Sequence, residues 1–163
     1  MRRASGAAEL QSRAVTLPFG VGAFGWDGVA ATAYKQSHGA GRGMGWRGVS
    51  RHPLAAPPGA AFELRYFEIA PGGYSSLERH RHVHVVVAVR GRGRALVGRA
   101  VVELAPLDVV QTPPFAPHRW VNDGEEPFGF LCTVDARRDR PQPLSDAEWE
   151  ALAADPRTAP FVH

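Results

Sequence analysis

Short apolar runs separated by turn residues fill the stretch from Ala61 to Val134. They recur about every ten residues, a spacing typical of antiparallel sandwiches and barrels. Parallel strands need crossover connections of a dozen or more residues, and about seven or eight strands in about 75 residues leave no room for them. We therefore expect an all-β fold in which antiparallel strands form one barrel.

Several strands can be placed individually. Phe62, Leu64 and Tyr66 alternate with other residues, and Pro71-Gly72-Gly73 is then expected to turn the chain. Val83 to Val89 is a nearly continuous run of β-branched residues and predicts a strand. The remaining strands are expected at residues 95–97, 100–104, 109–112, 118–121 and 128–134.

Three segments are expected along the chain. Residues 1–58 are rich in glycine and alanine and show no sustained hydrophobic period, so they predict an irregular N-terminal arm. The arm carries too many aromatic residues for a solvated tail, so part of it should pack on the barrel or on a second subunit. Residues 59–136 are the predicted barrel. Residues 137–163 form a C-terminal extension with a short helix, whose start is marked by the capping-box pair Ser145 and Glu148.

Composition argues against several classes of function. The net charge is +3, but the arginines are scattered among acidic residues, so no face is predicted to bind nucleic acid. Cys132 is the single cysteine, which rules out an intrachain disulfide and gives no sign of an oxidising compartment. Neither a signal peptide nor a membrane span is indicated. We expect a cytoplasmic protein that binds a small molecule and contacts neither nucleic acid nor membrane.

The sequence from Glu78 to His84, ERHRHVH, concentrates metal-binding side chains at the start of an apolar strand. Glu78, His80, His82 and His84 have the same parity and so face one side of a strand. Burying four ionisable groups is costly unless a metal ion coordinates them. On a straight strand Glu78 and His84 would lie about 20 Å apart, so the chain must bend near His82 if both bind one ion. The alternative is a solvated hairpin tip.

A second segment carries another candidate ligand. His118 follows the proline-rich turn at Pro113-Pro114 and opens a predicted strand on which Trp120 and Asn122 share its face. A lone histidine in such a place is more often structural. Beside the first cluster, however, it is the natural fourth ligand, supplied by a distant strand.

These two segments resemble the two sequence motifs of the cupin superfamily, over roughly residues 62–134. The resemblance implies a double-stranded β-helix, or jelly-roll barrel, around one divalent metal ion. It also implies the ligand set, in which the first motif supplies three positions and the second supplies one: Glu78, His80, His84 and His118.

The chain departs from these motifs at several positions. Glu78 stands where the first motif has a histidine, and His84 stands where it has a glutamate. Leu107 and Phe115 occupy glycine positions of the second motif. A register beginning at His80 and His82 would put Val86 in the carboxylate position, and valine cannot bind a metal. His82 is therefore expected to be a turn residue, a neighbour of the ligands or a spare ligand.

Three imidazoles and a carboxylate suit divalent Zn, Fe, Mn, Ni or Cu without choosing among them. The expected pocket residues are aromatic or polar side chains on the predicted strands: Tyr66, Gln111, Phe115, Trp120, Asn122 and Phe130. Each aromatic residue, taken singly, is more often ordinary barrel core than a pocket wall. Arg79, Arg81 and Arg119 have the opposite parity and are predicted on a solvated rim. Cys132 is expected to be a small buried hydrophobe.

The leading functional hypothesis is a small-molecule metalloenzyme, of oxygenase or Lewis-acid type, acting on a chelating substrate in specialised metabolism. The stretches WRGVSRHPL and FELRYFEIAPGGYSSLERH are similar to cupin domains of hydrazine synthesis, which implies N–N bond formation. The alternative is a non-catalytic cupin that binds a metabolite or serves as a partner subunit. In either case we expect a homodimer, formed through an edge strand or the arm, because an open barrel leaves edges to cover.

Overall fold

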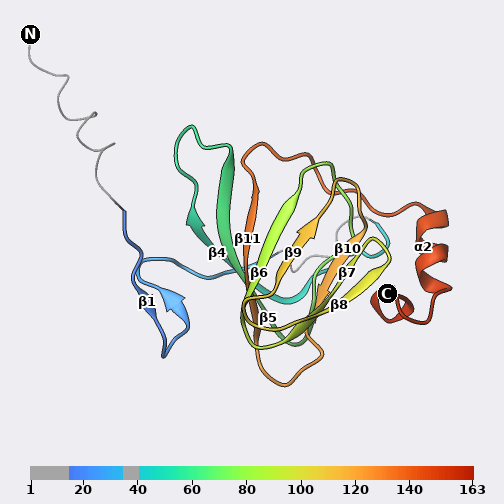
Figure 1. Ribbon diagram of the computed structural model, residues 1–163, viewed down its shortest axis with the longest axis horizontal. Coiled ribbons are helices and arrows are strands. Elements are labelled where there is room, and N and C mark those ends of the chain that lie inside the picture. Colours follow the sequence, from blue (N-terminus) through green and yellow to red (C-terminus); the bar gives the residue numbers. More distant parts are fainter. Residues whose placement is uncertain (1–14, 35–40) are drawn as a thin grey trace, which may run out of the picture.

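A curled antiparallel β-sheet forms the body of the protein (Figure 1). The structure is a computed structural model that describes residues 15–34 and 41–163. In this part of the chain, nine strands belong to the main sheet, in which β8-β7-β10-β5-β11-β6-β9 are neighbours in that order and β4 and β3 extend from β5. The all-β barrel predicted from the sequence is confirmed. The strands of the main sheet are β3 (Thr32–Ala33), β4 (Arg47–Ala55), β5 (Phe62–Tyr74), β6 (His84–Arg90), β7 (Gly93–Val97), β8 (Ala100–Leu104), β9 (Val109–Thr112), β10 (His118–Val121) and β11 (Phe128–Asp135).

The prediction of a turn at Pro71-Gly72-Gly73 is wrong, because these three residues lie within strand β5. Residues 62–69 of β5 pair with β11, whereas Tyr74 at its other end pairs with Val121 of β10. Gly72 has a φ of +70°, and a Cβ on Gly73 would lie 2.6 Å from the carbonyl oxygen of Arg47. The glycines thus bend one long strand from one part of the barrel wall into another.

Strand β4 lies in the segment for which the sequence predicted an irregular arm. It pairs with β5 from Arg47 to Ala55, so the sheet begins before residue 59. The register shifts near both ends of β4, and Gly48 and Pro53 break the alternation that would have marked a strand. Residues 1–14 and 35–40 of the expected arm lie outside the described residues.

The arm also packs on the barrel, as its aromatic residues suggested. Strands β1 (Phe19–Gly20) and β2 (Gly25–Trp26) form a small hairpin. The rings of Phe24 and Trp26 lie 5.7 Å and 5.1 Å from the ring of Tyr66. The hairpin therefore covers the outer side of β5.

The C-terminal extension contains helix α2 (Asp146–Ala153) and a short 3-10 helix, η1 (Ala159–Phe161). The predicted capping box is confirmed: the Ser145 hydroxyl accepts from the backbone N–H of Glu148, and the Glu148 carboxylate accepts from the N–H of Ser145. Trp149, Leu152 and Phe161 pack with Leu77 and Leu96 in a core cluster beside the barrel. No helix in the described ranges is long and apolar enough to cross a membrane.

The prediction that Arg119 lies on a solvated rim is wrong, because its side chain is fully buried. It donates to the carbonyl oxygens of Ser75 and Phe161 at 2.8 Å and 2.7 Å. Its outward parity directs it away from the barrel interior, but the C-terminal extension covers that face. Arg119 therefore joins the extension to the barrel.

Candidate metal centre

Three histidines from separate parts of the chain meet inside the barrel. His84 is the first residue of β6, His118 is the first residue of β10, and His80 lies in the connection between β5 and β6. Backbone hydrogen bonds in both directions between Glu78 and His118, at 3.2 Å and 2.9 Å, hold this connection beside β10. The chain bends at Arg81 and His82, as it must for His80 and His84 to approach one point.

The geometry of the three imidazoles suits one metal ion. One ring nitrogen from each of His80, His84 and His118 lies within 4.8 Å of the others. The Nε2 atoms of His80 and His84 are 2.9 Å apart. Two nitrogens that each lie about 2 Å from one ion are at most about 4 Å apart, so a small movement of the rings brings all three into coordinating positions. The three residues fit a divalent ion.

Hydrogen bonds at Nδ1 set the tautomers of two of these histidines. Nδ1 of His80 donates to the carbonyl oxygen of His82 at 2.8 Å, and Nδ1 of His118 donates to that of Ala116 at 2.9 Å. A carbonyl oxygen can only accept, so each Nδ1 carries the proton and each Nε2 keeps its lone pair. Fixing the ring through its outer nitrogen is the usual arrangement around a bound metal.

Burial keeps the three rings neutral. It lowers the pKa of His80 to about 4 and that of His118 to about 3. It also lowers the pKa of His84 far below its ordinary value, with a further contribution from the neighbouring imidazoles. Neutral imidazole is the form that binds a metal, so near pH 7 the cluster needs to lose no proton before it binds an ion.

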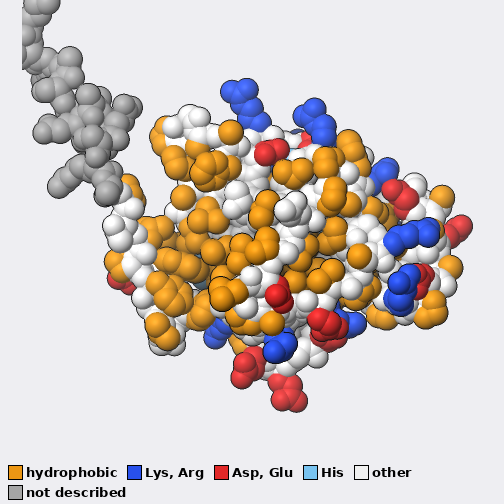
Figure 2. All heavy atoms as spheres, in the orientation of Figure 1, with side chains coloured by type: hydrophobic (Ala, Val, Ile, Leu, Met, Phe, Trp, Pro, Cys, Tyr) orange, Lys and Arg blue, Asp and Glu red, His pale blue; other side chains and the backbone are white. Residues whose placement is uncertain are grey.

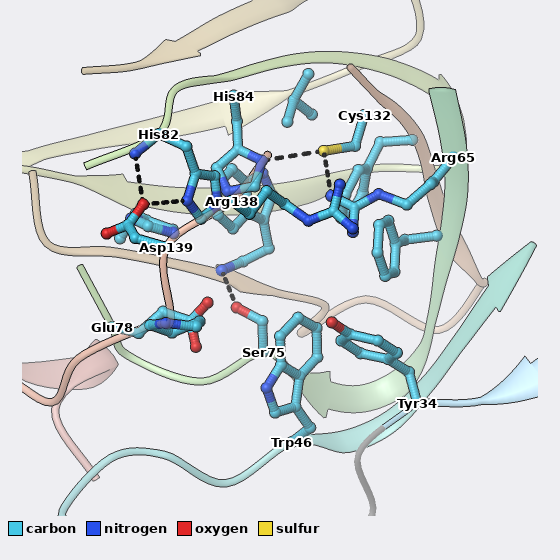
Figure 3. A pocket seen from close by; sticks show the side chains of 16 residues that line it. Tyr34, Trp46, Arg65, Ser75, Glu78, His82, His84, Cys132, Arg138 and Asp139 are labelled. Carbon is cyan, nitrogen blue, oxygen red and sulfur yellow. Dashed lines mark hydrogen bonds and ion pairs between the residues drawn. The ribbon is translucent and has the colours of Figure 1, made fainter. Parts of the chain in front are cut away.

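Glu78, the fourth predicted ligand, is buried and lines the cavity next to the histidines. The Ser76 hydroxyl donates a hydrogen bond to its carboxylate. Figure 3 shows this carboxylate apart from the His84 ring, and the histidine cluster forms without it. The structure brings together three of the four predicted ligands, and coordination by Glu78 stays a prediction.

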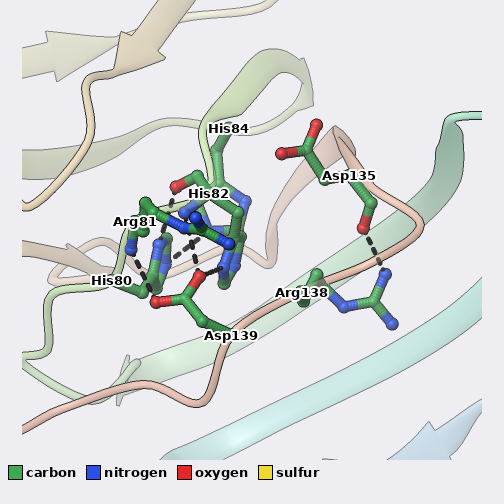
Figure 4. Close-up of polar contacts among 7 residues, drawn as sticks. All are labelled: His80, Arg81, His82, His84, Asp135, Arg138 and Asp139. Carbon is green, nitrogen blue, oxygen red and sulfur yellow. Dashed lines mark hydrogen bonds and ion pairs between the residues drawn. The ribbon is translucent and has the colours of Figure 1, made fainter.

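His82 lies beside the three-histidine cluster and packs against it. Its ring stacks on that of His80, with 3.5 Å between centroids and 6° between planes. Its Nδ1 lies 2.7 Å from Oδ1 of Asp139, whose carboxylate also accepts from the backbone N–H groups of Arg81 and His82 (Figure 4). These hydrogen bonds hold the pKa of the Asp139 carboxyl below its usual range, and the one from the backbone N–H of Arg81 has the largest effect. Asp139 had no sequence signal, because it lies 57 residues beyond His82.

A cavity of about 190 Å³ opens beside the cluster (Figure 3). Its polar residues include Ser75, Glu78, His84, Cys132 and Arg65. The apolar part of its wall consists largely of aromatic side chains, namely Tyr34, Trp46, Phe67, Trp120 and Phe130. The site therefore combines a metal-binding wall with an aromatic wall, as small-molecule sites commonly do.

The other predicted pocket residues divide into two groups. Trp120, Phe130 and His82 line the cavity. The remaining four do not, which corrects the expectation for Tyr66, Gln111, Phe115 and Asn122.

Each of these four residues has a different role or direction. Gln111 is exposed between Val110 and Thr112, which face inward, and Phe115 is 48% exposed. The Asn122 amide donates to the carbonyl oxygens of Ile69 and Glu126 and closes a turn. Tyr66 lies on the opposite side of β5, and its hydroxyl donates to Glu68.

Sequence reasoning missed several cavity residues because it chose the wrong face of β5. Phe62, Leu64 and Tyr66 suggested the interior, but Arg65 and Phe67 are the residues that line the cavity. The misleading signal came from the arm, which covers Tyr66 and so gives that face an apolar character too.

Comparisons with known proteins match these observations. The model of the cupin domain family matches residues 65–134. A 1-methylthio-D-xylulose 5-phosphate methylsulfurylase from Rhodospirillum rubrum is 44% identical over 137 residues, which cover 84% of this chain and 85% of the relative.

Two solved structures share the fold at substantial identity. A cupin-2 domain protein from Rhodospirillum rubrum is 43% identical, with a TM-score of 0.76 over 85% of this chain and 90% of its own. A cupin 2 conserved barrel domain protein from Rhodopseudomonas palustris is 41% identical, with a TM-score of 0.81 over 91% of this chain and 99% of its own.

Proposed function

Because this chain belongs to the cupin family, we propose that it is a metal-dependent enzyme that removes the methylthio group from a methylthio-substituted sugar phosphate. The observation that carries the proposal is the 44% identity to a methylsulfurylase over 84% of this chain, together with the three-histidine cluster at the cavity. The relative's name also corrects the expectation of N–N bond formation, since it describes chemistry at sulfur on a pentulose phosphate.

The residues around the cavity suit such a substrate. His80, His84 and His118 hold the ion, and a bound divalent metal supplies Lewis acidity to a substrate carbonyl oxygen. Glu78 is the proposed fourth ligand, with its carboxylate kept in place by the Ser76 hydroxyl. The aromatic wall packs against the less polar end of the substrate and keeps water from it.

The test is an assay of the metal-loaded protein with 1-methylthio-D-xylulose 5-phosphate and an added small thiol. The C–S bond to the sugar breaks, the methylthio group leaves on the thiol sulfur as a mixed disulfide, and the thiol proton ends on the carbon that held the sulfur. Mass spectrometry follows loss of that group from the sugar phosphate. The parent should consume the substrate, and a His80→Ala, His118→Ala double variant should not.

The matched control is Arg94→Met, because Arg94 pairs with Asp123 and does not line the cavity. This control should retain the parent's rate. A folded, metal-loaded parent that binds the substrate and leaves it intact would overturn the enzymatic assignment in favour of a metabolite-binding cupin.

A further inference from the structure

Arg65 is a buried cation in the wall of the cavity. Its side chain reaches from β5 toward Cys132 (Figure 3), and the residue is only 7% exposed. Within residues 15–34 and 41–163, no carboxylate lies within ion-pair distance of its guanidinium. Its hydrogen bond is a weak one, from Nη2 to Sγ of Cys132 at 3.7 Å, and its buried Nε has no hydrogen-bond partner.

An isolated buried guanidinium is unfavourable, because desolvation of the charge is not repaid by an opposite charge. Arginine cannot escape this cost by losing its proton. The aromatic face of Phe67, 5.1 Å from the guanidinium carbon, and a thiol sulfur offset only part of it. The guanidinium of Arg65 faces the cavity, so an anionic group on a bound ligand would supply the opposite charge that the described residues do not.

Two other arginines show what a satisfied guanidinium looks like in this protein. Arg119 is also buried, but backbone carbonyl oxygens accept from its nitrogens. Arg138 lines the same cavity as Arg65 but forms an ion pair with Glu63 at 2.8 Å. Within the described residues, neither a carboxylate nor a backbone carbonyl oxygen accepts from the guanidinium of Arg65. Its positive charge is therefore not balanced by the surrounding residues.

We propose that Arg65 binds the phosphate of the substrate, with two guanidinium N–H groups donating to two phosphate oxygens. This inference deepens the proposed function and rests on it for the identity of the anion as a sugar phosphate. Arg65 is then the residue that selects phosphorylated over unphosphorylated ligands.

The position of Arg65 relative to the histidines fits a short ligand. Arg65 and Cys132 are cross-strand partners on β5 and β11. Sγ of Cys132 lies 3.2 Å from Nδ1 of His84, whose opposite nitrogen faces His80. One thiol and one imidazole ring thus separate the guanidinium from the metal centre. A ligand with a few atoms between its carbonyl and its phosphate, such as a pentulose 5-phosphate, spans this gap.

The experiment compares the binding of D-xylulose 5-phosphate and D-xylulose to the metal-loaded protein by isothermal titration calorimetry. The parent should bind the phosphorylated sugar roughly 10- to 100-fold more tightly, as expected for charge-assisted hydrogen bonds. Arg65→Met should bring this ratio close to one. Arg65→Lys should give an intermediate ratio, because lysine keeps the charge but loses the paired donors.

Three further measurements separate this role from others. Arg94→Met, which removes an arginine outside the cavity, should keep the parent's ratio. Arg157→Met, which removes an exposed arginine paired with Asp155, should also keep it, and a loss there would mean that overall charge sets the preference. The melting temperature of ligand-free Arg65→Met should equal or exceed that of the parent, because an unpaired buried charge has been removed. A lower melting temperature with an unchanged ratio would show a structural role.

Because the readout is binding, it separates this inference from the proposed reaction. If the parent consumes the methylthio substrate but Arg65→Met keeps its preference for phosphate, only the role of Arg65 is wrong. If Arg65 controls phosphate binding but no substrate is consumed, only the proposed reaction is wrong. A parent that shows no preference for the phosphorylated sugar overturns the assignment of Arg65.

Discussion

Asp139 is linked to His80, a residue of the metal cluster, through the ring of His82. Asp139 accepts from His82 at Nδ1, and the His82 ring stacks on that of His80 with 3.5 Å between centroids. The C-terminal segment therefore positions a residue of the metal cluster through one intermediate side chain.

This link predicts that Asp139→Ala weakens metal binding. With its anchor lost, His82 is free to leave the His80 ring, and the cluster is less well ordered before the ion binds. We expect the affinity for the divalent ion to fall roughly 10- to 100-fold, as is usual when groups behind the ligands are removed. Competition against a coloured chelator measures the affinity. Asp155→Ala, which removes a carboxylate paired with Arg157 at the surface, is the control; equal affinities in both variants would contradict the link.

The metal-free protein should lose stability in mild acid. Burial holds the pKa of His80 at about 4 and that of His118 at about 3, whereas an unfolded histidine titrates near 6.5. Below pH 6.5 the unfolded chain therefore binds more protons, and the free energy of unfolding decreases as the pH falls toward 4. Each histidine contributes up to about 1.4 kcal/mol per pH unit.

Urea unfolding of the metal-free protein at pH 7, 6, 5 and 4 measures this decrease. A His80→Gln, His118→Gln variant has lost both groups, so its free energy of unfolding should fall less steeply across the same range. Identical slopes for the parent and the variant would show that these histidines are not buried in the neutral form.

Arg119→Met should destabilise the fold without emptying the metal site. The change removes the donors to the carbonyl oxygens of Ser75 and Phe161 and leaves both without their charged partner. We expect a loss of about 2–4 kcal/mol in the free energy of unfolding, measured in urea. Arg157→Met removes an exposed arginine and should cost less than about 1 kcal/mol. A variant of Arg119 as stable as the parent would contradict the role assigned to it.

We propose that the chain forms a homodimer through the edge at β9. In the described part of the sheet β9 pairs only with β6. Val85 on β6, Val109 on β9 and Leu107 in the turn that joins β8 to β9 are exposed. Figure 2 shows hydrophobic side chains over the middle of the viewed face and charged ones toward its rim. A second copy can cover both the free strand edge and these side chains.

Light scattering after size-exclusion chromatography tests this interface. The parent should run as a dimer, and a Val85→Glu, Val109→Lys variant as a monomer. Val21→Glu places a charge on the exposed arm hairpin instead and tests the arm as the alternative contact. A dimer that survives the first variant and dissociates in the second would move the interface to the arm.

The sequence predicted those features that depend on short-range patterns. Alternation and turn residues predicted most of the strands. The inventory of histidines indicated a metal site, and the resemblance to the cupin motifs implied that His80, His84 and His118 belong to it. The bend at His82 was predicted from distance alone, because a straight strand cannot bring both ends of the motif to one ion.

Features that depend on pairing between distant segments were not predictable in this way. Arg65 lines the cavity because the arm covers the opposite face of β5, and Asp139 reaches His82 from the C-terminal extension. Strand β4 was missed because its apolar pattern is interrupted, and it is held in the sheet by pairing with β5. In each case the deciding neighbour lies far away in the sequence.

The central claim is that His80, His84 and His118 hold one divalent metal ion, and elemental analysis of purified protein tests it most directly. The parent, reconstituted with Zn, Fe, Mn, Ni or Cu and freed of loose metal by gel filtration, should retain close to one ion per chain. A His80→Ala, His118→Ala variant should retain none, while His163→Ala, which changes a histidine outside the cluster, should match the parent. Negligible metal in the parent after every reconstitution, or equal metal in the parent and the double variant, would contradict the account.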